Sequence, residues 1–133
     1  MKKNSNTKDG TEELTLCRSL PKGTFDNSEM VFNIRPECTL TIHRREWDGS
    51  GRIVPNPSLQ EILEFLSKNY KETMCKYRDP FRNDLGMWFV SCRVYSTYDG
   101  ATYSQAFIGK DTDPKKAALR LIISLPSGND WIV

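Results

Sequence analysis

The sequence predicts an α+β protein with a small antiparallel sheet packed with two amphipathic helices. The expected order is helix, hairpin, helix after an N-terminal strand region. Three observations lead to this class: a capped amphipathic run begins at Ser58, alternating runs flank Asp99-Gly100, and a second capped amphipathic run begins at Asp113. The chain has 133 residues, of which 38% are apolar, enough for one compact core.

The N-terminal part of the chain changes in character near residue 28. Residues 1–28 are polar with scattered apolar positions, which is typical of a loosely ordered arm. From Met30 to Ile42 apolar and polar residues alternate around Pro36, and this period of two predicts one or two strands. We therefore expect a polar arm over 1–28 and a single α+β domain over 29–133.

The first predicted helix begins after a turn. Asp48 to Gly51 has turn chemistry, and Ser58 with Glu61 forms a capping box. The apolar face of this helix is centred on Leu63 and consists of Leu59, Ile62, Leu63, Leu66 and Tyr70. The polar, basic segment 71–87 that follows is expected to be a long exposed connection.

The hairpin is the clearest strand prediction, with strands from about Trp88 to Tyr95 and from about Ala101 to Ile108. A two-residue turn at Asp99-Gly100 pairs residues whose numbers sum to 199, so the two faces can be assigned. The expected core face carries Trp88, Val90, Cys92, Val94, Tyr103 and Phe107. The other face carries Phe89, Ser91, Arg93, Tyr95, Thr102, Ser104, Ala106 and Ile108.

The mixed face of the hairpin is the candidate partner-binding surface. Its central residues are Ser91, Arg93, Tyr95 and Ser104, and Tyr and Arg are the types that concentrate energy at protein interfaces. The alternative is that this face is simply solvated, and a register slip of one residue would exchange the two faces.

The last predicted helix begins at Asp113, an N-cap residue, with Pro114 in the favoured first position. Its expected buried side consists of Ala117, Ala118, Leu121, Ile122 and Leu125. Two amphipathic helices are therefore available to cover the core face of the hairpin.

Composition and residue spacing argue against a strongly basic nucleic-acid-binding protein, a metal site and an enzyme. Nineteen Lys and Arg residues against 17 Asp and Glu residues give a net charge of +2, far from the balance of a protein that depends on phosphate contacts. The single histidine, His43, and four widely spaced cysteines form no recognisable metal or nucleophile motif. We expect no cofactor, no metal site and no enzyme activity.

The chain shows no signal-peptide core and no apolar run of membrane-spanning length. We therefore expect a cytoplasmic protein that does not enter a membrane and keeps its four cysteines reduced. Its oligomeric state is left open.

Three motifs between Gly49 and Leu125 carry a resemblance to a known family. They are Pro57-Ser58-Leu59 opening a helix, Trp88-Phe89-Val90-Ser91-Cys92 starting a strand, and Ala106 followed by Asp111-Thr112-Asp113-Pro114 leading to Ala117-Ala118-Leu119. On these motifs the chain is similar to the phage ABA-sandwich domain family. The resemblance implies an antiparallel sheet with helices and a phage or prophage origin, and it brings no catalytic residues.

The first functional hypothesis follows from this resemblance and from the absence of site chemistry. We expect a non-catalytic phage or prophage protein that binds a bacterial protein in the cytoplasm of the host cell, for example as an inhibitor of a host defence system.

The order of helix, strands and helix also looks like a double-stranded-RNA-binding domain. Lys115 and Lys116 stand where that family has a Lys pair opening its last helix. The alternative hypothesis is therefore a small RNA- or DNA-binding module with Tyr95 or Tyr103 as a stacking surface. Its candidate contact residues are His43, Arg44, Arg45, Lys115 and Lys116.

Overall fold

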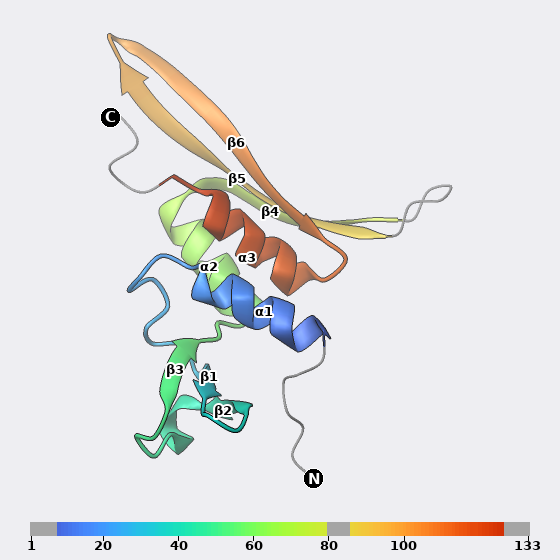
Figure 1. Ribbon diagram of the computed structural model, residues 1–133. Coiled ribbons are helices and arrows are strands. Elements are labelled where there is room, and N and C mark those ends of the chain that lie inside the picture. Colours follow the sequence, from blue (N-terminus) through green and yellow to red (C-terminus); the bar gives the residue numbers. More distant parts are fainter. Residues whose placement is uncertain (1–7, 80–85, 127–133) are drawn as a thin grey trace. The chain divides into compact units, whose positions relative to one another are not determined.

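The computed structural model describes residues 8–79 and 86–126. Over these residues the fold is α+β, with three α-helices and two small antiparallel sheets of three strands each (Figure 1). The α+β class is confirmed, but the sequence predicted one sheet and the structure has two. The chain divides into two compact units, Met1–Glu61 and Ile62–Val133, whereas we expected an arm over 1–28 and one domain after it.

The first unit contains α1 (Lys8–Arg18) and a sheet with the strand order β2-β1-β3. The strands are β1 (Met30–Ile34), β2 (Thr39–His43) and β3 (Arg52–Pro55), with the 3-10 turn η1 (Arg44–Glu46) after β2. The predicted strands between Met30 and Ile42 are confirmed. The central strand β1 pairs with β2 and β3 at its two edges, and its residues Val31 to Asn33 are buried.

Helix α1 lies where the sequence predicted a loosely ordered arm. Cys17 in this helix is buried, and its thiol lies 4.0 Å from Oδ1 of Asn56, the residue that follows β3. The expectation for residues 1–28 therefore differs from the structure over Lys8–Arg18. The apolar positions of this helix are few, so its helical character depends on tertiary contacts that the sequence pattern does not show.

The second unit contains a sheet with the order β4-β5-β6, formed by β4 (Lys71–Arg78), β5 (Met87–Tyr98) and β6 (Ala101–Asp111). The predicted register is confirmed, because Cys92 pairs with Phe107 and the two residue numbers of every other β5–β6 pair also sum to 199. Asp99 and Gly100 have φ values of 52° and 80°, as a type I′ turn requires.

The prediction of an exposed connection over 71–87 is wrong for Lys71–Arg78, which form β4. Residues 80–85 of that segment lie outside the described residues. Strand β4 is an edge strand whose side chains are mostly exposed. Its polar composition therefore lacks the apolar alternation that predicts a strand.

Helix α3 (Pro114–Ser124) packs against β5 and β6. Its predicted start is confirmed, because the Asp113 carboxylate accepts a hydrogen bond of 2.9 Å from the backbone N–H of Lys116. Val90 and Cys92 on the predicted core face are buried, but Tyr103 on the same face is exposed. The reason is visible in Figure 1: the hairpin extends well beyond the end of α3.

Helix α2 (Leu59–Asn69) begins at the predicted capping box. The Ser58 hydroxyl accepts a bond of 3.1 Å from the N–H of Glu61, and the Glu61 carboxylate accepts one of 2.7 Å from the N–H of Ser58. Ile62 and Leu66 are fully buried, whereas Leu63, the predicted centre of the stripe, is only half-buried.

Leu66→Ala is therefore expected to lower the free energy of unfolding by about 2 to 5 kcal/mol, because it empties a fully buried site. Leu63→Ala is the matched change on the same helix. It is expected to lower the free energy of unfolding clearly less than Leu66→Ala, because the Leu63 side chain is only half-buried. Urea unfolding followed by circular dichroism measures both values. Equal losses for the two variants would contradict the burial described here.

Candidate protein-binding face

The side of the second sheet turned away from α3 is the candidate functional surface, and we call it the open face. Cross-strand partners share a face of a sheet, so the register shows which residues lie on the side opposite to Val90 and Cys92. The open face includes Met74, Phe89, Ser91, Arg93, Tyr95, Ser104, Ala106 and Ile108. Three of its large side chains are well exposed: Met74 by 46%, Tyr95 by 44% and Ile108 by 57%.

A polar network joins three strands across this face. Nη1 of Arg93 on β5 donates a hydrogen bond of 3.0 Å to Oγ of Ser104 on β6. Nε of Arg93 lies 3.7 Å from Oε1 of Glu72 on β4, and the Tyr95 hydroxyl donates to Oε2 of the same carboxylate. These contacts hold Arg93 and Tyr95 in defined positions before any partner arrives.

The structure therefore brings three of the four predicted partner-binding residues into one network. The fourth, Ser91, lies on the same face, between Met74 on β4 and Ile108 on β6 in the register. Exposed apolar side chains of Met74 and Ile108 therefore flank Ser91, and the polar network of Arg93, Tyr95 and Ser104 lies next to them on the same face.

Glu72 is the member of the network that sequence reasoning missed. It lies in an irregularity of the β4–β5 register between Lys71 and Met74, and its φ of 51° is in the left-handed region. A β-bulge re-aims a side chain in this way, and here it brings the carboxylate to Arg93 and Tyr95. No local sequence signal marked this position, because the segment lacked the alternation of a strand.

The network leaves Tyr95 in its ordinary protonation state. The hydrogen bond to Glu72 raises the pKa of Tyr95, so this side chain remains the neutral phenol that a tyrosine is at physiological pH. On the opposite side of the sheet, burial raises the pKa of the Cys92 thiol to about 11. Cys92 is therefore a protonated core residue, and the open face offers hydrogen-bonding and apolar groups suited to recognition.

The residues of the nucleic-acid alternative are divided between the two units. His43, Arg44 and Arg45 belong to the first compact unit, and Lys115 and Lys116 belong to the second. Several of them have structural roles: Nδ1 of His43 accepts a bond of 3.2 Å from the N–H of Arg45, and Nε of Arg44 donates one of 2.8 Å to the backbone carbonyl of Ser28. Lys116 is only 8% exposed.

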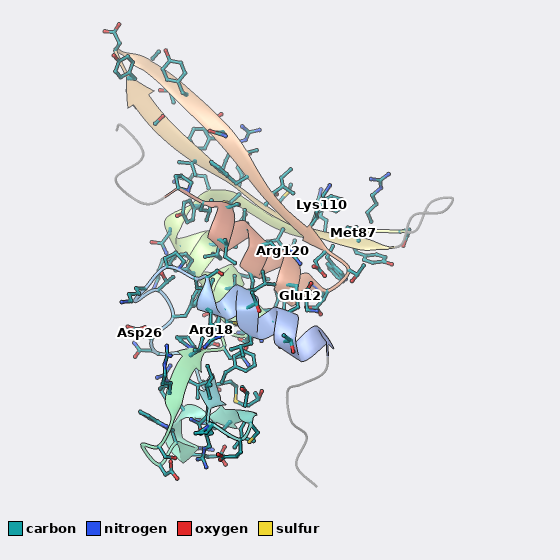
Figure 2. All side chains as sticks on the ribbon, in the orientation of Figure 1. Glu12, Arg18, Asp26, Met87, Lys110 and Arg120 are labelled. Atoms are coloured by element: carbon teal, nitrogen blue, oxygen red, sulfur yellow. The ribbon has the colours of Figure 1, made fainter. Side chains whose placement is uncertain are left out.

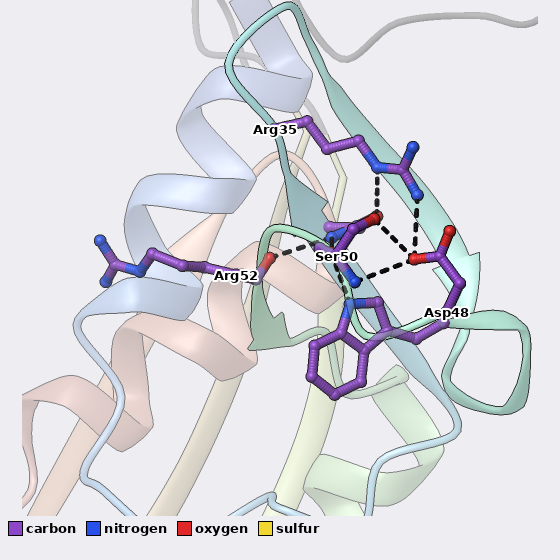
Figure 3. Close-up of polar contacts among 6 residues, drawn as sticks. Arg35, Asp48, Ser50 and Arg52 are labelled. Atoms are coloured by element: carbon purple, nitrogen blue, oxygen red, sulfur yellow. Dashed lines mark hydrogen bonds and ion pairs between the residues drawn. The ribbon is translucent and has the colours of Figure 1, made fainter.

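A second polar cluster lies at the turn between β2 and β3 (Figure 3). The Asp48 carboxylate accepts bonds from the backbone N–H and the hydroxyl of Ser50, which lower the pKa of that carboxyl. The buried Asn33 amide donates to the carbonyls of Ser50 and Arg52, at 3.0 and 3.2 Å, and Arg35 bridges Asn33 and Asp48. The turn predicted at Asp48–Gly51 is confirmed, and these bonds attach it to β1.

Within residues 8–79 and 86–126, no group of three or more His, Cys, Asp or Glu side chains is placed to hold a metal ion. In the same part of the chain, every helix is too short or too polar to span a membrane. Comparisons with family models, curated proteins and solved structures find no match to this chain.

Proposed function

We propose that this protein is a non-catalytic binding module whose open face docks on another protein. The observation that carries the proposal is the sheet face opposite to α3, on which exposed Met74 and Ile108 lie next to the network of Arg93, Tyr95 and Ser104. Aromatic residues, Met and Arg are enriched in protein interfaces, and Tyr and Arg contribute most often to their hot spots.

Pre-organisation supports the same function. Ser104 and Glu72 already orient Arg93, and Glu72 orients Tyr95, so these side chains lose little conformational freedom when a partner binds. Because the chain resembles a phage family, the proposed partner is a bacterial host protein, for example a component of a host defence system. A phage or prophage origin is part of this proposal.

The test combines capture with a defined interface variant. The full chain and the Arg93→Ala/Tyr95→Ala double variant are used as bait in bacterial lysate at micromolar concentration. Each specifically captured protein is identified, purified and titrated by calorimetry. We expect the double variant to bind at least about tenfold more weakly, since hot-spot truncations cost about 2 kcal/mol or more.

The control variant is Thr41→Ala/Arg52→Ala, which removes two exposed side chains from the first unit. It should bind like the unaltered chain. Both variants should keep the free energy of unfolding within about 1 kcal/mol of that of the unaltered chain, because neither changes a buried residue. The proposal is contradicted if repeated captures recover no specific protein or if the double variant retains full affinity. Recovery of nucleic acid alone, with an affinity that falls steeply with salt, would favour the alternative function.

A further inference from the structure

The outer edges of the two sheets are protected to different degrees. In the first sheet the edge strands β2 and β3 have only five and four residues, and β3 ends at Pro55. In the second sheet the edge strand β4 carries a register irregularity after Lys71 and three cationic side chains. Short strands, proline, bulges and charges are the devices by which proteins prevent unwanted pairing at sheet edges.

Strand β6 is the edge that lacks these devices. It has eleven residues, and the nine from Ala101 to Gly109 include no charged residue and no proline. Residues 101–106 are all exposed. A long, uncharged, exposed edge is a template for another strand, so β6 is an interaction surface distinct from the open face.

The charges at the two ends of β6 indicate which strand fits. Lys110 stands at one end, and Asp99 stands in the turn just before the other end. Asp111, next to Lys110, already pairs with Arg120 at 2.9 Å. When two β6 strands run antiparallel with Gln105 opposite Gln105, Lys110 of each copy lies next to Asp99 of the other. Asp111 comes opposite the same Asp99, but Asp111 is already paired with Arg120, and the uncharged middle of the strand brings no like charges together.

Two exposed tyrosines fit the same arrangement. Tyr98 and Tyr103 lie on the α3 side of the sheet but are 59% and 54% exposed. The ribbon in Figure 2 shows that the hairpin extends beyond α3. In an antiparallel pair of copies, the part of one hairpin that packs against α3 lies alongside the part of the other hairpin that carries Tyr98 and Tyr103. These exposed aromatic side chains would then lie beside α3 of the second copy.

We propose that two copies of this chain pair β6 with β6 around a two-fold axis near Gln105, forming a continuous six-stranded antiparallel sheet. In this register Gln105 opposes Gln105 of the second copy, and Tyr103 opposes its Phe107. The pairing uses the sheet edge and leaves the open face free, so it goes beyond the proposed function and does not depend on it.

The backbone of β6 provides the first test. Counted from the two-residue turn, hydrogen-bonded and non-bonded pairs alternate, so the N–H of Ala106 points to the outer edge and not to β5. Ala106→Pro removes this outward donor, whereas Ala106→Val keeps it. Light scattering after size exclusion should give about twice 15.3 kDa for the unaltered chain and for Ala106→Val, and a monomer for Ala106→Pro.

The second test places a charge on the axis and does not rely on proline. Gln105→Lys and Gln105→Glu each oppose like charges across the two-fold axis, so each alone should dimerise at least about tenfold more weakly. An equimolar mixture should restore the dimer, because Lys then opposes Glu. A chain that stays monomeric at all concentrations overturns the proposal, and so does a mixture that dimerises no better than either variant alone.

Discussion

Gly109→Ala is expected to lower the free energy of unfolding by about 3 kcal/mol or more. A Cβ at Gly109 would lie 2.1 Å from the carbonyl oxygen of Ala117 and 2.5 Å from the backbone nitrogen of Leu121. Both neighbours are backbone atoms of α3, which cannot rotate away as a side chain would. The helix must therefore move off β6, and the packing of Leu121 and Ala117 against the sheet is lost with it.

Thermal and urea unfolding by circular dichroism measure this effect. Ala106→Val is the matched control, because it enlarges an exposed residue of the same strand, and it should change stability by no more than about 0.5 kcal/mol. A loss below about 1 kcal/mol for Gly109→Ala would contradict the close approach of α3 to β6.

Val90→Asp is expected to unfold the second unit under conditions in which the unaltered chain is folded. Val90 is fully buried on the α3 side of the central strand, and an unpaired carboxylate there costs several kcal/mol, comparable to the whole stability of a small domain. The sequence pattern placed Val94 on the same core face. Val94 is only half-buried, so its substitution by Asp should be milder.

The neighbouring variant Ser91→Asp is the control for Val90→Asp. Ser91 points to the open face, so its carboxylate remains in contact with water and the stability should stay within about 1 kcal/mol. Far-UV circular dichroism of the two purified variants decides the matter. If Ser91→Asp unfolds and Val90→Asp does not, the two faces are the reverse of those described.

Much of the candidate site was predictable because its signals are local. The Asp99-Gly100 turn determines the register of β5 and β6, and the period of two then places Arg93, Tyr95 and Ser104 on one face. The contact of Arg93 with Ser104 follows from that face. Which face α3 covers was also predictable, because Val90 and Cys92 are more apolar than their neighbours.

The remaining parts of the site depend on contacts between distant segments. Strand β4 brings Glu72 and Met74 to the open face, but its polar sequence resembles an exposed loop because an edge strand need not alternate. The bulge that turns Glu72 toward Tyr95 arises from pairing with β5. No property of residues 71–74 alone indicates it.

The sequence by itself determined the elements that depend on neighbouring residues: the capped starts of α2 and α3 at Ser58 and Asp113, the type I′ turn, and the hairpin register. Each follows from hydrogen bonds or dihedral preferences within a few residues. Over the described residues, only the tertiary structure decided that there are two sheets, that Lys8–Arg18 are helical, and that β6 is an edge strand. Strand pairing and burial join residues far apart in the chain, so their energies cannot be assigned from a local pattern.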